Sequence, residues 1–296
     1  MSAVLQAGSA GAGAGSLSSR RIVASAGWSA SLAAFAVAIA VLALVFGFVV
    51  VQGIPALRPL LFTTVTNGVS GGLANAISGT CLLVTGGVLL TVVIGIGTGI
   101  WLAEYGRGWL GDGLRFLSDV LAGVPSIVIG YFGYALLVQR LGWNFSLAAG
   151  SIALALIMLP YVVRGTDQSL AAVPRELREG SDALGADPTQ TLFGIAMPYA
   201  FPSILTSLLL ATGIAIGETA PLIYTAGWSN YMPSLALTHS PVGYLTYVVW
   251  TFISQPFAQS HALAYAAAVI LMLMIFTTNV VARLALGAIA KRQRGA

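Results

Sequence analysis

Residues 164–198 read RGTDQSLAAVPRELREGSDALGADPTQTLFGIAMP, the longest polar segment of the chain after the N-terminal tail. This segment holds eight of the 22 charged side chains, which are costly to place in hydrocarbon, so we expect it in water between membrane spans. Pro174 suits the first turn of a helix that stops near Gly185, and Asp187 can cap a second helix that begins at Pro188. The sequence therefore predicts two short helices joined at a glycine, a compact shape suited to docking onto another protein.

The rest of the chain has the composition of a helical membrane protein. Of 296 residues, 57% are hydrophobic and 7% are charged, against about 25% charged in an average soluble domain. The mean hydropathy is +0.91. The single cysteine, Cys81, excludes an internal disulfide. The net charge of +4 does not indicate nucleic-acid binding, because most basic residues flank apolar runs. We predict an all-α integral membrane protein.

Six apolar runs predict six transmembrane helices. They cover residues 28–51, 76–103, 119–138, 147–163, 199–226 and 261–284. The runs define a membrane domain over residues 28–285, between a disordered tail at 1–27 and a basic tail at 286–296. A further apolar patch, 244–253, is too short to span and indicates an interfacial or re-entrant helix.

Basic residues predict the orientation of these spans. With six spans and the N-terminus inside, eleven of the 13 lysines and arginines fall on inside segments, and Arg58 and Arg140 fall outside. Because cytoplasmic loops carry the excess of basic residues, we expect both termini and the polar loop 166–197 in the cytoplasm.

Motifs for catalysis or cofactor binding are missing from the sequence. Lys291 is the only lysine and lies in the C-terminal tail, so a P-loop of the Walker type is impossible. His239 and His261 have no acidic or cysteine neighbours. We therefore expect no catalytic residue, no metal site and no cofactor in this chain.

Some residues inside the apolar runs indicate packing or bending. Gly95/Gly99 and Gly213/Gly217 are GxxxG pairs, whose small residues let helices approach closely, although glycine is common throughout this chain. Pro125, near the start of the third run, predicts a helix that can bend.

Glu218 is the one ionisable residue well inside an apolar run. A carboxylate in hydrocarbon costs about 2.5 kcal/mol or more, so it should face a partner or a water-filled path. Glu218 is either half of a structural ion pair or part of a solute path or its gate. Arg164, at the inner end of the fourth run, either snorkels to the lipid surface or contacts the solute.

The polar loop resembles the loop motif of binding-protein-dependent ABC importer permeases. That motif is E-A-A, three residues, G, nine residues, I-x-L-P. Its spacing is kept here by Glu179, Gly180, Ser181, Gly185, Ile195, Met197 and Pro198, although Gly180, Ser181 and Met197 depart from its residue types. The resemblance implies a type I importer (MetI-like) permease fold over the membrane domain. It also implies an ATPase-coupling site made of Glu179, Asp182, Ala183, Leu184 and Gly185.

Further blocks resemble the PstA-type permeases of phosphate-specific uptake systems. They are WLAEYG (101–106), RFLSDVLAGVPSIVIG (115–130), IMLPYVVRGT (157–166), VPRELREGSDALGA (173–186) and IGETAPLIYTAG (216–227). The resemblance implies the cytoplasmic membrane of a prokaryote and inorganic phosphate as the transported solute. The implied partners are a second permease of PstC type, two PstB-type ATPases that bind ATP and magnesium, and an extracytoplasmic PstS-type phosphate-binding protein.

For an oxyanion solute, hydroxyls, arginine and helix N-termini are suitable contacts. Ser126, Arg164 and Thr219 are the candidate contacts, with Glu218 in the path or its gate. In this family an arginine often sits four residues before the glutamate, but Ile214 holds that position here. We therefore expect Glu218 to pair with Arg164 or with a basic residue of the second permease.

Three other functions stay open at this point. The first is a permease of the same fold for another oxyanion, such as phosphonate or sulfate. The second is a secondary transporter or channel with Glu218 as its proton site, and the third is a membrane anchor or sensor without transport.

Overall fold

The computed structural model describes residues 10–68 and 70–294, in one unit that ends at Val51 and a second that starts at Gln52. The first unit is helical: α1 (Ala10–Gly53) contains the first predicted span. Residues 10–27, predicted to be a disordered tail, belong to this helix, because a helix nucleated in the adjoining apolar span extends into its flank more easily than a new helix forms. Residues 1–9 lie outside the described residues.

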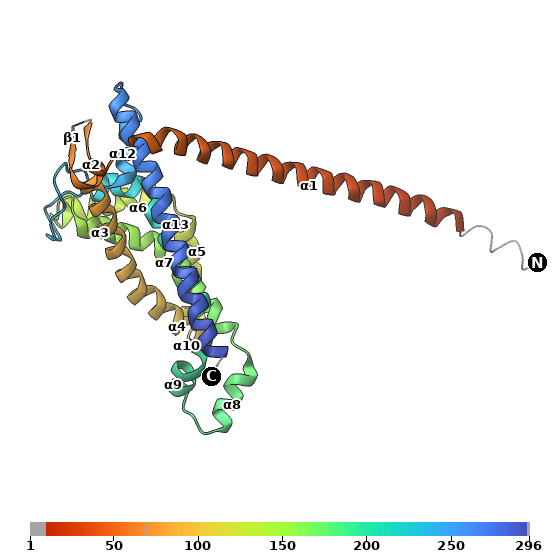
Figure 1. Ribbon diagram of the computed structural model, residues 1–296. Helices are drawn as coiled ribbons and strands as arrows, with labels where there is room; N and C mark the ends of the chain where they lie inside the picture. The colour runs from red at the N-terminus through yellow and green to blue at the C-terminus, as the bar shows by residue number, and fades with distance from the viewer. Residues whose placement is uncertain (1–9, 69, 295–296) are drawn as a thin grey trace, which may run out of the picture. The chain divides into compact units, whose positions relative to one another are not determined.

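The second unit is a bundle of helices with one small hairpin. The hairpin pairs β1 (Thr66–Asn67) with β2 (Ser70–Gly71). The helices are α2 (Pro59–Thr63), α3 (Ala74–Thr91), α4 (Gly97–Glu104), α5 (Trp109–Gly123), α6 (Ser126–Gly133), α7 (Leu147–Ala171), α8 (Arg175–Ala183), α9 (Pro188–Thr191), α10 (Met197–Gly217), α11 (Ala220–Thr225), α12 (Leu245–Phe252) and α13 (Ala258–Arg294). Three π-helical segments interrupt or extend the long helices: Val92–Ile96, Tyr134–Arg140 and Leu192–Ala196. Helices α8 and α9 lie at one end of this unit, and β1 and α2 lie at the other (Figure 1).

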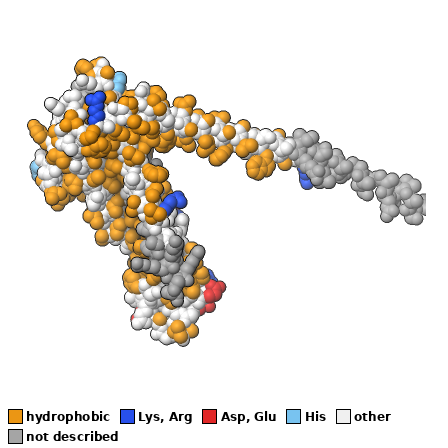
Figure 2. Space-filling model, viewed as in Figure 1, with side chains coloured by type: hydrophobic (Ala, Val, Ile, Leu, Met, Phe, Trp, Pro, Cys, Tyr) orange, Lys and Arg blue, Asp and Glu red, His pale blue; other side chains and the backbone are white. Residues whose placement is uncertain are grey.

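Helix α7 is the centre of the bundle. Its residues Leu154, Met158 and Val162 are completely buried, in a core shared with Leu83 of α3 and Ala211 of α10. Figure 2 shows that hydrophobic side chains cover most of the visible surface of the bundle, as expected for helices that face lipid.

Helices α3 and α4 run parallel to α7 along a line of glycines. Gly87 faces Leu154, Gly95 faces Val162 and Gly99 faces Thr166, so both segments advance in the same direction. A Cβ at Gly95 would stand 3.1 Å from Val162 Cγ1, which confirms close packing at the first GxxxG pair. Gly213 and Gly217 of the second pair have nothing within 4 Å of an added Cβ.

Because α3–α4 and α7 are parallel, the chain between them must cross back, and α5 and α6 make that crossing. The two helices meet at an angle of 101°. Val124 and Pro125 are extended at the break, since proline disfavours helix in the residue before it and cannot donate a backbone hydrogen bond. The predicted bounds of this span, 119–138, are therefore wrong at the start, because helix begins at Trp109. The bend predicted at Pro125 is present and is sharp.

The fifth predicted span is also broken. Helix α10 runs antiparallel to α7, with Ser169 Oγ donating to Ser203 Oγ at 2.8 Å. It ends at Gly217, Glu218 is extended, and α11 begins at Ala220. The expected helix over 199–226 is therefore interrupted after Gly217.

Six membrane passages are available by length and composition. Among the residues that the structure describes, five helices qualify singly, and the bent pair α5–α6 supplies the sixth. The short helix α12 matches the predicted patch that cannot span. The last span, α13, continues to Arg294, so most of the predicted basic tail at 286–296 extends this helix, and residues 295 and 296 lie outside the described residues.

Candidate functional site

The polar loop folds as two short helices joined at a glycine, as predicted. Helix α8 starts directly after Pro174, and α9 starts after Asp187, whose side chain and that of Gln190 form a reciprocal capping box. Between the helices Gly185 adopts φ +82°, a left-handed conformation that favours glycine. The loop is thus a compact pair of short helices joined by a defined turn at Gly185.

Four of the predicted coupling residues, 182–185, form the end of α8 and the turn after it, and Glu179 lies earlier in α8. All five are exposed: Glu179, Asp182, Ala183, Leu184 and Gly185. The Leu184 side chain is 91% exposed, although it is apolar. An exposed leucine beside acidic residues at a rigid turn makes a small mixed surface, and interfaces bury surfaces of this kind.

Arg178 of α8 connects this loop to two membrane spans. Its guanidinium donates to both carboxylate oxygens of Glu104, at 2.9 and 3.0 Å, and to the Leu170 carbonyl at 3.2 Å. Glu104 ends α4, and Leu170 lies in the last turn of α7. We call Arg178 and Glu104 the coupling-loop ion pair; sequence reasoning assigned neither residue, because 74 positions separate them.

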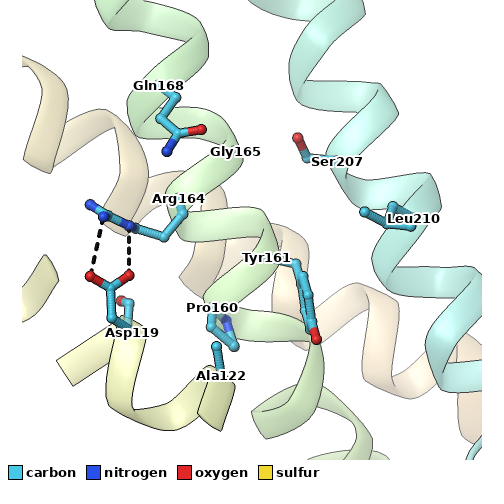
Figure 3. Close-up of a pocket in the computed structure, with 10 residues that line it drawn as sticks. Asp119, Ala122, Pro160, Tyr161, Arg164, Gly165, Gln168, Ser207 and Leu210 are labelled. Carbon is cyan, nitrogen blue, oxygen red and sulfur yellow. Dashed lines mark hydrogen bonds and ion pairs between the residues drawn. The ribbon is translucent and has the colours of Figure 1, made fainter. Parts of the chain in front are cut away.

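A second set of ion pairs joins α5 to α7. Arg115 donates to both oxygens of Asp167, at 2.9 and 3.2 Å, to the carbonyl of Leu102 in α4 and to the carbonyl of Gly106 in the loop that follows. Arg164 binds both oxygens of Asp119, at 3.0 and 3.2 Å, and lies 3.8 Å from Asp167 (Figure 3). Arg164 therefore does not snorkel freely, and it is not the partner of Glu218.

Arg164 borders a cavity of about 370 Å³ between α5, α7 and α10. In Figure 3 Asp119 reaches it from α5, Arg164 and Gln168 from α7, and Ser207 from α10. Its complete lining is Ser118, Asp119, Ala122, Pro160, Tyr161, Arg164, Gly165, Gln168, Ser207 and Leu210. A guanidinium, an amide and hydroxyls face one space, which suits an anion that accepts several hydrogen bonds.

A smaller cavity of about 190 Å³ adjoins the first, since Ala122 and Tyr161 line both. Ser126 and Glu218 border it, so the structure brings these two predicted site residues together. Thr219 lies in the same backbone break but lines neither of these two cavities.

Glu218 forms no ion pair with any residue that the structure describes. The break around it is held by Thr246, whose hydroxyl donates to the Glu218 carbonyl at 2.8 Å. Its expected pairing with Arg164 is wrong because Asp119 and Asp167 already occupy that guanidinium. A basic partner from a second permease stays a prediction.

Comparisons with known proteins agree with this architecture. Residues 95–295 match the family model described as "Binding-protein-dependent transport system inner membrane component". The phosphate transport system permease protein PstA 2 of Mycobacterium bovis is 42% identical over 265 residues, covering 90% of this chain and 88% of that protein. The PstA protein of Yersinia pestis is 40% identical over 238 residues, covering 79% and 80%.

Solved structures confirm the predicted importer-permease fold. A chain of the MetNI methionine ABC transporter in an inward-facing conformation matches with a TM-score of 0.61 and 17% identity, covering 73% of this chain and 95% of that one. The long family match and the two relatives together lead to one conclusion: this chain belongs to the family of binding-protein-dependent transport system inner membrane components, as a multi-pass membrane subunit.

Proposed function

We propose that this chain is the permease subunit of an ATP-driven importer of inorganic phosphate. The observation that carries the substrate is the 40–42% identity to phosphate permeases over about four fifths or more of the chain. The cavity around Arg164 suits that substrate, because a planar guanidinium with neighbouring amide and hydroxyl groups matches the oxygens of a tetrahedral anion.

Coupling to ATP hydrolysis passes through the loop 166–197. The exposed residues Glu179 and 182–185 dock on an ATPase subunit, which holds the ATP and magnesium, and Leu184 inserts its apolar side chain there. The coupling-loop ion pair carries the resulting displacement to α4 and α7. The complex holds two such ATPases, a second permease and an extracytoplasmic phosphate-binding protein.

The solute path runs along the two adjoining cavities, from Glu218 and Ser126 to Arg164. The end of the bundle that holds α8 and α9 faces the cytoplasm, and both termini lie on that side. Six candidate passages and the excess of basic residues in the segments predicted to lie inside support this orientation.

The test is uptake of labelled phosphate by cells whose own phosphate permease genes are deleted and which express this chain with its partner genes. We expect uptake that requires intact ATPase subunits and is not inhibited by excess sulfate. Uptake of sulfate in place of phosphate would identify a permease for another oxyanion. Phosphate transport by the purified chain alone, in vesicles without ATPases, would make it a secondary transporter and overturn the proposal.

A further inference from the structure

Arg164 contacts two carboxylates that differ in burial and in the number of their ion pairs. Asp167 has a side chain only 9% exposed and is fixed by both arms of Arg115. The Asp119 side chain is 57% exposed and, among the described residues, pairs with Arg164 alone. Asp119 can therefore swing away while Asp167 keeps the guanidinium in place.

The Asp119 carboxylate occupies the position that an oxyanion would take. Two of its oxygens lie 3.0 and 3.2 Å from neighbouring nitrogens of the guanidinium fork, and a phosphate or sulfate offers oxygens in the same arrangement (Figure 3). A cavity needs only about 10–15 Å³ of such space to hold one water, so the 370 Å³ beside Arg164 accommodates a tetrahedral anion. Ser118 and Gln168 supply further hydrogen-bond donors, while the Ser207 hydroxyl donates to the Ser203 carbonyl at 3.3 Å.

Asp119 is itself part of the cavity lining, so its displaced carboxylate would lie beside an anion bound there. An ionised carboxylate is an acceptor of hydrogen bonds and not a donor. Every form of phosphate near neutral pH keeps a hydroxyl that can donate to it, whereas sulfate has none. Sulfate would thus face a like charge without a hydrogen bond, whereas phosphate would donate one to it.

We propose that Asp119 makes the cavity at Arg164 selective for oxyanions that carry a proton, admitting phosphate and phosphonates and rejecting sulfate. The inference rests on the proposed function, since it needs an oxyanion to reach this cavity. It adds a second selection step inside the membrane, after the one made by any extracytoplasmic binding protein.

The experiment is thermal unfolding of the assembled complex, without binding protein or nucleotide, titrated with sodium phosphate or sodium sulfate at constant ionic strength. In the unmutated complex we expect phosphate to stabilise at about tenfold lower concentration than sulfate. Asp119→Asn should abolish this preference, because an amide can donate to sulfate, and Asp119→Glu should retain it. Arg164→Gln should lose the response to both anions, which separates this cavity from anion sites elsewhere in the complex.

Asp112→Asn is the matched control. Asp112 lies on the same helix, is 77% exposed, contacts Arg115 at 3.7 Å and does not line the cavity, so its removal should leave the preference unchanged. Equal responses to the two anions in the unmutated complex, or an unchanged preference in Asp119→Asn, would overturn the inference. Phosphate uptake measured separately decides the proposed function: selective binding without uptake would refute that function and leave the selectivity of the cavity standing.

Discussion

At the scale of single residues, the contacts of Arg164 depend on the planar shape of its guanidinium as well as on its charge. The guanidinium reaches Asp119 with two nitrogens and Asp167 with a third contact. An ammonium group cannot span these positions, so we expect Arg164→Lys to lower phosphate uptake about tenfold and Arg164→Gln to abolish it. The measurement is the initial rate of labelled phosphate uptake at equal amounts of assembled complex. Arg140→Lys, at an exposed position, is the control; normal uptake in both Arg164 variants would mean a residue that serves only to anchor the helix.

Glu218 is the second residue whose role can be tested. It faces a small cavity beside Ser126 and has no ion pair among the described residues. We expect Glu218→Gln to reduce uptake roughly tenfold, because the solute path or the second permease loses a charge it uses. Ile214 lines the same cavity, so Ile214→Arg should be tolerated and should supply a partner within this chain. Uptake is compared in both variants and in the double variant, with assembly measured by co-purification. Unimpaired uptake in Glu218→Gln would remove the residue from the path.

The sequence predicted which positions carry unusual charges but not how they pair. Glu218 and Arg164 stand out because hydrocarbon tolerates few ionisable groups. Asp119 and Glu104 do not stand out, because each lies at the edge of an apolar run where charges are ordinary. Their partners are 45 and 74 positions away, and only the packing of α5 and α4 against the loop and α7 brings them together.

At the scale of secondary-structure elements, the coupling loop depends on its turn. Gly185 has φ +82°, which costs a β-branched residue about 1–2 kcal/mol or more, so Gly185→Val should distort the tip from Ala183 to Gly185. We expect loss of phosphate-stimulated ATP hydrolysis in the complex, while the chain still inserts. Gly180→Ala is the control, because Gly180 is helical and has open space around it. Normal stimulation in Gly185→Val would show that the turn is not needed for docking.

The coupling-loop ion pair makes a separate prediction for this element. Glu104→Gln or Arg178→Gln should lower the number of phosphates transported per ATP, because α8 can then move without α4. Exchanging the two charges, as Glu104→Arg with Arg178→Glu, should restore part of the loss. Glu176→Gln, exposed in the first turn of the same helix, is the control. A transport-to-ATP ratio that stays constant across these variants would contradict the proposed link.

Element boundaries were predictable where local chemistry sets them, and failed where tertiary packing does. Pro174, Gly185 and Asp187 predicted both short helices, since capping and turn preferences act within a few residues. Pro125 predicted a bend, but not a turn of 101°. Helix α5 begins before the predicted run 119–138, because two charges of this helix are neutralised by α7.

At the scale of the whole molecule, the path of the chain predicts which surfaces are accessible from each side. The loop tip at Leu184 and the loop at Ser234 should lie on opposite sides of the membrane. In a Cys81→Ser background, we expect Ser234→Cys to react with an impermeant maleimide in intact cells, and Leu184→Cys to react only after permeabilisation. Labelling of both positions, or of neither, in intact cells would contradict six passages with the loop inside.

The line of glycines along which the segment α3–α4 packs against α7 also affects how the protein is made. These two segments are parallel neighbours, so they cannot assemble as a hairpin when they leave the ribosome. During synthesis α3 and α4 are inserted before their partner α7 exists. Until α5 and α6 have crossed and α7 has followed, Gly87, Gly95 and Gly99 stay exposed to lipid or to the insertion machinery. The 101° break at Val124 and Pro125 lies in that intervening crossing, which makes the insertion of α5 and α6 the step on which maturation of the core depends.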